Sequence, residues 1–589
     1  MSQQKSVSDG AILTVLGTAA AVVTLAWLSA GIGGVIRHGQ WPEITFTSSA
    51  NAIPRLLTEP AYPANAWPAA ARSGLPDAQT FYTVLAIVLV LGAILGVVVA
   101  ILILRWKAAK AGGKADESSG SAVPEQPTTS PDIMRRELIN QYLSAAAVSS
   151  RAAIVRPAIT EQHPSARSVG IYLGQDTEHN IALFGTLADT YCVMGPPQCG
   201  KGAHFVIGAV LDAPGAVVVT ANHPDTLRHT IQQREKQGPV RVFDPQNLSG
   251  WPTRSRWSIH RGCEDPPTAM ARARALVYAL PPGDESTHSA ITTMATTVIR
   301  CYLHAAGLDD RPARHLLGWA ADPANTEPIH MLRISSAVAC GWAKELQELS
   351  GAEPAQRSEV WDRVRQAFSC LADPRVLEAC SADDDDQWDI PSFLQAGGTL
   401  YLLAATDAQP CVAPLLTALV DDVVAQGRQM AHRLPAGRLD PPLLLLLDEA
   451  ASIAPIPGLP VLMAEGGNVG MPTVAVLRSL AEARIRWGKT GAAAMWEASS
   501  IKLVFDGGGN LAELSGVGAE ANDDTLVLPA TGNDLAAPPA DLAGSPPARD
   551  SGTAVVLHRH TGPVPTQLAP WWRRQPEMTT TDEDTLVLP

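Results

Sequence analysis

The stretch GPPQCGKG, Gly195 to Gly202, decides how the rest of the chain is interpreted. A short apolar run, Tyr191 to Met194, precedes it and predicts a buried strand. The segment AHFVIGAVL, Ala203 to Leu211, follows it with the apolar spacing of a helix. Strand, glycine loop and helix in this order form the context in which a Walker A pattern binds phosphate. The alternative is a glycine-rich turn that carries a surface lysine.

Every residue of this loop is a candidate nucleotide ligand. Gly195 and Gly200 allow the backbone to curl so that successive N–H groups face one phosphate. Lys201 is expected to reach the β- and γ-phosphates and to act in catalysis. Gly202 stands where Ser or Thr usually gives a hydroxyl to Mg²⁺, so another group or water must hold the metal. The predicted cofactor-binding set also includes the four residues between the two glycines: Pro196, Pro197, Gln198 and Cys199.

A second chemical signal is PPLLLLLDEA, Pro441 to Ala450. Five consecutive leucines predict a strand that is buried on both faces, as a central parallel strand is. Such a strand delivers Asp448 and Glu449 to the carboxyl edge of the sheet, as a Walker B strand does. Asp448 is expected to hold Mg²⁺, and Glu449 to orient or deprotonate the attacking water. The expected cofactors are therefore ATP and Mg²⁺.

Composition limits the class of protein. A chain of 589 residues is long enough for two to four domains. Its net charge of −14 excludes a protein that coats DNA uniformly, so any nucleic-acid contact must be local or made through a partner. The 8 cysteines form no CxxC pair, which favours reduced cytosolic thiols over metal or disulfide sites.

Two long apolar runs, Ala11 to Ile36 and Phe81 to Leu104, predict a two-helix transmembrane hairpin. Basic residues follow the second run at once and place the remainder of the chain in the cytoplasm by the positive-inside rule: Arg105, Lys107, Lys110 and Lys114. The predicted localisation is thus the inner (cytoplasmic) membrane, multi-pass, with a cytoplasmic ATPase region. A signal peptide cleaved near SANA, Ser49 to Ala52, is the alternative for the first run.

Strand signals alternate with helical patterns in the remainder of the chain, which predicts an α/β fold with a parallel sheet. The predicted strands include AVVVT from Ala216, VRVF from Val240, TLYLLA from Thr399, TVAVL from Thr473 and IKLVF from Ile501. Between 268 and 395 only helical patterns occur, so an all-α insertion is expected there. The predicted domains are a membrane anchor 1–110, a linker 111–150, a first ATPase part 151–267, the insertion 268–395, a second ATPase part 396–520, and a Pro/Asp-rich tail 521–589 with an edge strand at 553–558.

Two further patterns each have more than one interpretation. The run Asp383 to Asp386 is a candidate metal site, but a solvated loop is the favoured interpretation. The hexapeptide DTLVLP occurs twice in the tail, at Asp524–Pro529 and at Asp584–Pro589, and fits either a docking peptide or a coincidence.

Several blocks together resemble the TraG/TraD family of type IV coupling proteins. They are the two predicted N-terminal membrane helices, the GKG-type phosphate loop, the expected all-α insertion, the stretch LLLLLDEAASIAPIPGLP (Leu443–Pro460), the stretch GMPTVAVLRSLAEARIRWG (Gly470–Gly488) and the stretch AAAMWEASSIKLVF (Ala492–Phe505). The resemblance implies a RecA-like, homohexameric ATPase at the base of a conjugative channel. Its implied partners are the membrane, the components of a type IV secretion channel, and a relaxase bound to single-stranded DNA, or an effector protein.

The chain departs from this family at one position that matters. Arg478 stands before Ser479 and Leu480, where the family usually carries a glutamine that senses the γ-phosphate. An arginine is still able to contact phosphate, or else the coupling between hydrolysis and movement is altered. His223 and Asp225 follow the second predicted strand of the ATPase region where family members often carry Lys and an acid, so they are weaker candidates.

Other motor classes remain as alternatives. An FtsK-like pump for double-stranded DNA usually ends in a DNA-reading winged helix, whereas this tail is Pro-rich and acidic. A type VII protein-secretion ATPase chains several cassettes, whereas this chain has one phosphate loop. Glu449 argues against an adaptor that never hydrolyses ATP. Two basic groups are candidates for lining a DNA pore: Arg357, Arg363 and Arg365, and the stretch Arg484 to Lys489.

Overall fold

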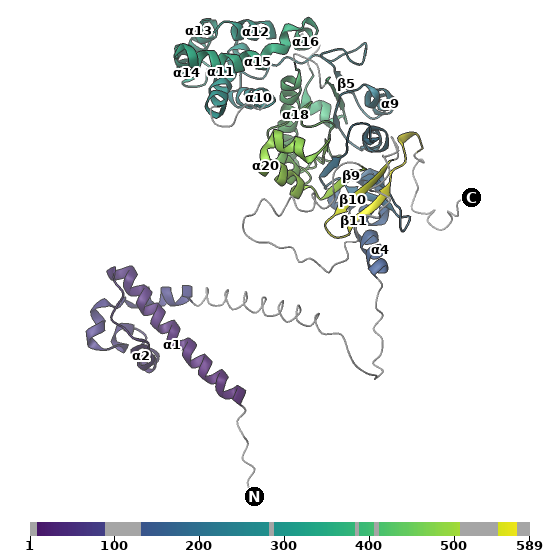
Figure 1. Ribbon diagram of the computed structural model, residues 1–589. Helices are drawn as coiled ribbons and strands as arrows, with labels where there is room; N and C mark the ends of the chain where they lie inside the picture. Colours follow the sequence, from purple (N-terminus) through teal and green to yellow (C-terminus); the bar gives the residue numbers. More distant parts are fainter. Residues whose placement is uncertain are drawn as a thin grey trace, which may run out of the picture. The chain divides into compact units, whose positions relative to one another are not determined.

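A computed structural model of the chain describes residues 9–88, 131–281, 288–382, 388–405, 411–506 and 552–573. It divides into two compact units, Met1–Gln126 and Pro127–Pro589, and Figure 1 shows the elements of each. The tail hexapeptides and the acidic run 383–386 lie outside the described residues.

The first unit is a small helical assembly. Helix α1 (Asp9–His38) is followed by α2 (Phe46–Thr58) and by two short 3₁₀ turns, η1 (Pro63–Ala66) and η2 (Ala69–Gly74). A capping box starts α2, because Thr45 and Ser48 exchange side-chain to backbone hydrogen bonds. Trp67 lies at the centre of the apolar cluster and donates its Nε1–H to Ser49 Oγ at 3.2 Å.

The predicted transmembrane hairpin and multi-pass membrane localisation are wrong for this structure. Within the ranges given above, no helix is at once long and apolar enough to cross a bilayer. The second half of α1 instead buries side chains such as Ala30 against the cluster around Trp67. The segment 37–80, between the two apolar runs, supplies most of that cluster. The part of the second apolar run at 89–104, and the basic residues after it, lie outside the described residues.

The second unit is built on one mixed sheet in the order β2-β1-β11-β10-β9-β3-β8-β7-β4-β6-β5. The seven strands from β9 to β5 are parallel, and the other four extend the β9 edge antiparallel. The strands are β1 (Gly170–Asp176), β2 (Ala182–Thr186), β3 (Tyr191–Met194), β4 (Val217–Ala221), β5 (Val240–Phe243), β6 (Thr399–Leu403), β7 (Leu444–Leu447), β8 (Thr473–Leu477), β9 (Ile501–Phe505), β10 (Thr553–His558) and β11 (Gly562–Gln567).

The central strands are apolar on both faces because the sheet separates two hydrophobic cores. Cys192 and Met194 of β3 face one core, whereas Tyr191 and Val193 face the other. The alternation follows from the period of two in a strand. It explains why β7 is a plain run of leucines, since a helical layer covers each face of a parallel sheet.

Helices complete the unit. Before the sheet come α4 (Pro131–Tyr142), α5 (Ala145–Ser149), α6 (Ala152–Val155) and α7 (Ala166–Val169). Around the sheet lie α8 (Ile207–Asp212), α9 (Asp225–Arg234), α18 (Ala413–Arg433), α19 (Leu459–Glu465) and α20 (Leu480–Ala498). The helix predicted from Ala203 begins differently, because its first turn, η3 (Gly202–Val206), is π-helical. Helix α20 is broken at Gly488, which has a φ of 73°.

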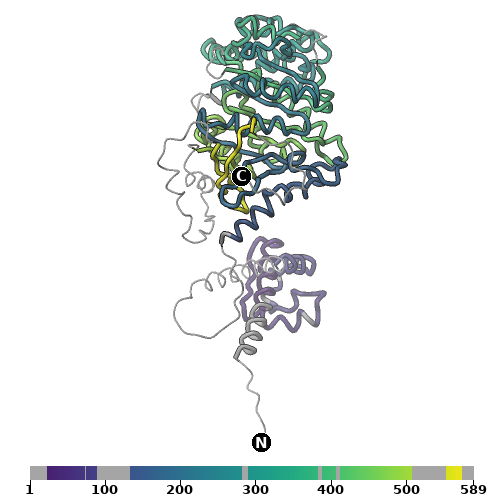
Figure 2. Tube along the Cα trace, turned by 90° about the vertical axis from the view of Figure 1, so that its right-hand side faces the viewer, coloured from purple at the N-terminus to yellow at the C-terminus, as the bar shows by residue number. Residues whose placement is uncertain are grey.

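Only helices connect β5 to β6 in the described residues. They are α10 (Pro266–Tyr278), α11 (His288–Leu308), α12 (Ala313–Ala321), α13 (Glu327–Ile334), α14 (Trp342–Ser350), α15 (Pro354–Phe368), η4 (Ser369–Ala372), α16 (Pro374–Ala379) and α17 (Ile390–Gln395). Figures 1 and 2 show α11–α16 at one end of the unit and the β10–β11 hairpin, in yellow, toward the other. Helix α10 packs on α18, and this contact joins the helical part to the sheet.

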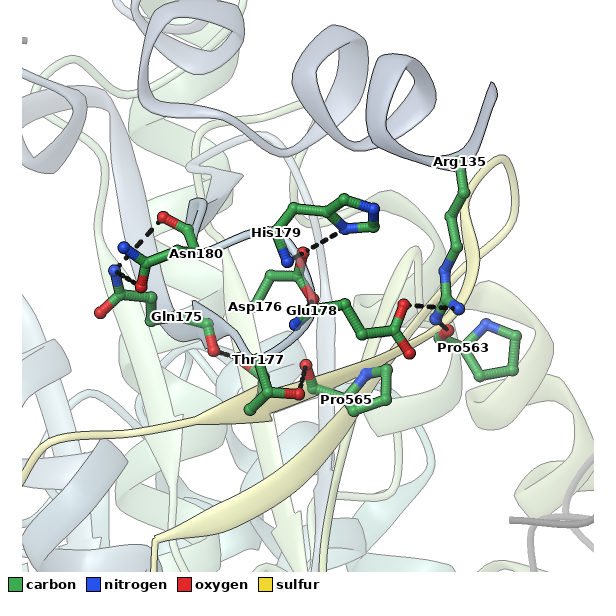
Figure 3. A network of polar contacts seen from close by, with 10 residues as sticks. Arg135, Gln175, Asp176, Thr177, Glu178, His179, Asn180, Pro563 and Pro565 are labelled. Atoms are coloured by element: carbon green, nitrogen blue, oxygen red, sulfur yellow. Dashed lines mark hydrogen bonds and ion pairs between the residues drawn. The ribbon is translucent and has the colours of Figure 1, made fainter. Parts of the chain in front are cut away.

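The antiparallel edge is fastened by polar contacts at the β1–β2 turn, drawn in Figure 3. The carboxylate of Asp176 accepts from the backbone N–H groups of Glu178 and His179 and contacts His179 Nδ1 at 2.7 Å. Glu178 pairs with Arg135 of α4 at 2.9 Å. Thr177 donates its N–H to Pro565 O of β11 at 3.1 Å. The network therefore ties α4, the turn and the C-terminal hairpin together.

Candidate functional site

Three neighbouring strands bring the predicted site residues to one edge of the sheet. β8 pairs with β3 on one side and with β7 on the other, all in parallel. Their carboxyl ends lead directly into Gly195, Arg478 and Asp448. Neighbouring strands are about 4.8 Å apart, so these three positions lie side by side. Arg478, which is far from both motifs in sequence, lies between them.

The loop Gly195–Gly202 has the backbone of an anion-binding turn. Gln198 and Gly200 have φ values of 64° and 87°, both in the left-handed region, whereas Lys201 is right-handed. Such a change of hand points successive N–H groups into one concavity. The N–H of Gly195 donates to Leu477 O at 3.2 Å, which anchors the loop on β8.

Lys201 is buried within its own loop. Its ammonium donates to Gly195 O at 2.5 Å and to Pro196 O at 3.0 Å, and it lies 3.9 Å from Cys199 Sγ. Burial raises the pKa of the Cys199 thiol, with Lys201 acting in the opposite direction. The loop thus holds the ammonium beside the concavity, where an anion would meet it.

The two outer glycines of the loop differ in the space around them. A Cβ on Gly195 would lie 2.6 Å from Cys199 Sγ and 2.9 Å from Phe505 Cβ, so only glycine fits. A Cβ on Gly202 would meet nothing within 4 Å. The missing Ser or Thr of the general motif is therefore not a consequence of crowding.

Asp448 ends β7 in a desolvated position. Burial, and then the neighbouring charge of Glu449, raise the pKa of Asp448 to about 6, while Lys201 and Arg478 act to lower it. Thr220 of β4 donates its hydroxyl to Asp448 O at 2.7 Å, which fixes the backbone at this point. Two adjacent carboxylates, one with a raised pKa, suit a divalent cation, because the metal replaces the proton.

Glu449 has an unusual backbone conformation, and its side chain forms an ion pair with Arg478. Its φ is 51°, a left-handed value that is rare for a residue other than Gly, Asn or Asp. Its side chain is only 10% exposed, and Oε2 lies 2.5 Å from Nε of Arg478. Strained conformations of this kind concentrate at functional sites.

Sequence reasoning missed two residues that position this site. One is Thr220, the polar end of the predicted strand AVVVT. The other is Glu482, whose Oε2 accepts the N–H of Arg478 at 3.0 Å. Burial raises the pKa of Glu482. Its signal was present as a capping pattern, since Ser479 at the N-cap of α20 accepts from the N–H of Glu482.

The remaining candidates lie apart from these contacts. His223 and Asp225 are exposed after β4. Arg363 donates to Pro281 O, and Arg357 donates to Ser350 O at 3.0 Å. Arg365 pairs with Asp362 on its own helix. Arg486 donates to the carbonyl oxygens of Ala451, Tyr278 and Leu280, so it joins α20 to α10 and to the turn after Glu449. Arg484 and Lys489 are exposed.

Two family models match the chain in separate regions. Residues 137–255 match the family described as "Type IV secretory system Conjugative DNA transfer". Residues 442–517 match "TraM recognition site of TraD and TraG". The first region contains the phosphate loop, and the second contains Asp448, Glu449 and Arg478. No curated protein matches the chain.

Several solved structures are similar to the chain at low identity. The plasmid coupling protein TrwB in complex with ADP and Mg²⁺ is 18% identical, with a TM-score of 0.45, over 74% of this chain and 95% of that one. TrwB with a non-hydrolysable ATP analogue is 18% identical, with a TM-score of 0.45, over 66% of this chain and 88% of that one. VirB4 of Thermoanaerobacter pseudethanolicus is 12% identical, with a TM-score of 0.36, over 68% of this chain and 96% of that one. The family assignment rests on the two regional matches.

Proposed function

Because the chain belongs to the TraG/TraD family of type IV coupling proteins, we propose that it is an ATP-driven motor that delivers DNA to a type IV secretion channel. The observation that carries this proposal is the convergence of Lys201, Asp448, Glu449 and Arg478 at one sheet edge. These groups come from the two regions that match the two family models. A nucleotide-hydrolysing site needs this combination of cation, metal ligand and base.

The residues have distinct roles in this proposal. The loop N–H groups and Lys201 bind the β- and γ-phosphates of ATP. Asp448 holds Mg²⁺, which neutralises charge on the phosphate oxygens when bound. Glu449 orients the attacking water and accepts its proton. Arg478 contacts the γ-phosphate, as a guanidinium does with planar oxyanions.

Release of Glu449 is part of the same mechanism. In the structure Arg478 and Glu449 form an ion pair at 2.5 Å, and Glu449 is almost fully buried. The guanidinium of Arg478 occupies one carboxylate oxygen of Glu449 and holds that side chain at the end of β8. The γ-phosphate competes for the guanidinium, and its arrival leaves Glu449 available to the water.

DNA or a relaxase–DNA complex is the proposed cargo, and a homohexamer is the proposed assembly. The net charge of −14 requires that a DNA contact be local. The exposed basic side chains Arg484 and Lys489 of α20 are the best candidates, because Arg486 between them is already bonded to three carbonyl oxygens.

The test is the ATPase rate of the purified full chain with and without single-stranded oligonucleotide, at low and moderate salt. A DNA motor should be stimulated, and the stimulation should fall steeply with salt because phosphate contacts release counterions. Full ATPase activity that no DNA of any sequence or strandedness changes would exclude DNA as the cargo and favour a protein substrate.

A further inference from the structure

A cavity of about 400 Å³ lies beside the start of the phosphate-loop helix. It is lined by His204 of η3, by Tyr172 and Gln175 of β1, and by residues at the end of β11 and after it: Gln567, Leu568, Ala569, Pro570, Trp572 and Arg573. The volume is within the range of about 300–1,000 Å³ that is typical of small-ligand sites.

The topology places this cavity at the same sheet edge as the phosphate loop. β10 runs antiparallel to β9, and Ala554 pairs with Phe505, the last residue of β9. Phe505 in turn lies against Gly195. β11 then returns to this edge, where Gln567 pairs with Gln175 at the end of β1. The C-terminal turn η7 (Trp571–Arg573) contacts η3 directly.

His204 links the cavity to the phosphate loop. It follows Lys201 by three residues, which is roughly 5 Å along a helix axis. Its Nδ1 lies 2.7 Å from Leu568 O, and a carbonyl only accepts, so Nδ1 carries a proton and donates. This buried bond fixes the wall of the cavity to the phosphate-loop helix, and a Cβ on Gly552 would collide with the same imidazole at 2.4 Å.

The rim supplies the chemistry that an aromatic base requires. Trp572 is 57% exposed, although folding normally buries so large an apolar side chain. Gln175, Gln567 and Arg573 line the same space, although the amide of Gln175 is bonded to Asn180 and the amide oxygen of Gln567 accepts from Thr553. A flat aromatic face with amide and carbonyl groups around it suits stacking and edge hydrogen bonds to a nucleobase.

We propose that this cavity is the base subsite of the nucleotide site, in which Trp572 stacks on the adenine of ATP and the Gln567–Arg573 segment contacts its edge. The inference rests on the proposed ATP site, whose triphosphate would lie one helical turn away at Lys201. It assigns a function to the C-terminal hairpin, which both family models leave uncovered.

The experiment compares two probes on the full chain, ATP and inorganic tripolyphosphate, which shares the phosphates but lacks the base. Equilibrium binding of labelled ATP is measured, and tripolyphosphate is added as a competitor. Trp572→Ala should weaken ATP binding about tenfold and leave tripolyphosphate binding unchanged. Trp572→Phe, which keeps an aromatic face, should restore most of the affinity for ATP. Gln567→Ala provides a second, smaller test within the lining of the cavity.

The outcomes separate this inference from the function on which it rests. Lys201→Ala should weaken ATP and tripolyphosphate alike, because both contact the phosphate loop. Unchanged ATP affinity in Trp572→Ala, or an equal loss for both probes, would overturn the base subsite and leave the phosphate site intact. A wild-type chain that binds neither probe would overturn the nucleotide site and the base subsite together.

Discussion

Nε of Arg478 lies 2.5 Å from Oε2 of Glu449, so the end of β8 is bonded to the proposed base at the end of β7. The pair joins a residue outside both Walker motifs to the proposed general base. It explains how an arginine is accommodated where related proteins are expected to carry glutamine. In the proposed cycle the guanidinium would have two anionic partners, Glu449 before ATP binds and the γ-phosphate afterwards.

Arg478→Ala should lower kcat by roughly 10²-fold or more and weaken ATP binding far less, because the lost charge acts mainly on the transferring phosphoryl group. Arg478→Gln should retain part of the rate, since an amide still donates to phosphate. The measurement is steady-state hydrolysis beside equilibrium ATP binding. Arg433→Ala, at the exposed end of α18, is the matched control and should behave as wild type. Equal kcat in Arg478→Ala and wild type would remove Arg478 from the site.

The raised pKa of Asp448 predicts an acid limit for activity. Below pH 6 its carboxyl is protonated and cannot hold Mg²⁺, so Mg²⁺-dependent hydrolysis should fall as the pH decreases through about 6. Because metal and proton compete for one carboxylate, a higher Mg²⁺ concentration should move this limit to lower pH. A pH profile that is indifferent to Mg²⁺ concentration would assign the limit to another group.

The same raised pKa predicts that the ionised carboxylate of Asp448 lowers the stability of the folded protein. The folded value of about 6 lies above the usual value of 3.8, so the folded state binds the proton more tightly than the unfolded state does. Stability from this group is therefore present at low pH and is lost as the pH rises through 6. Asp448→Asn should stabilise the metal-free chain at pH 7 by roughly 1–3 kcal/mol. The gain in thermal unfolding midpoint should shrink near pH 4.5, and a gain that persists there would contradict burial of the charge as its cause.

Two glycine substitutions in one loop should have opposite outcomes. Gly202→Ser finds open space, so the protein should fold normally and need less Mg²⁺ for half-maximal hydrolysis, because the hydroxyl is a new metal ligand. Gly195→Ser forces a Cβ against Cys199 and Phe505 and should abolish ATP binding. Titration of both variants with Mg²⁺ at saturating ATP checks the pair. A Gly202→Ser variant that is inactive but folded would show that a side chain at this position obstructs the site.

Local patterns were sufficient to predict the strands that carry the site. The strand predicted at Tyr191–Met194 has the bounds of β3, and the strand predicted from the leucine run ends at Leu447, directly before Asp448. Such predictions succeed because burial on both faces leaves an uninterrupted apolar signature. The strand predicted at 553–558 has the bounds of β10, but it is not an edge strand, because β10 pairs with β9 on one side and with β11 on the other. Its partner β11 was not predicted, because Gly562, Pro563 and Pro565 are typical of a turn.

Contacts between segments that are far apart in the chain could not be predicted from the sequence. The pairing of Arg478 with Glu449 depends on β8 lying between β3 and β7, and strand order leaves no local trace. The contact of His204 with Leu568 joins two residues that are 364 positions apart in the sequence. The apolar run in α1 was misread because hydropathy does not distinguish a helix that packs on Trp67 from one that spans a bilayer.

If Lys201 and Glu449 serve one hydrolytic site in different steps, their variants must differ in ATP binding. The most direct measurement is ATP binding and turnover in Lys201→Ala and Glu449→Gln side by side. Glu449→Gln should bind ATP as wild type does and hydrolyse it roughly 10²–10⁴-fold more slowly, since only the base is lost. Lys201→Ala should lose tight binding and turnover together. Normal turnover in purified, folded Lys201→Ala would contradict the account.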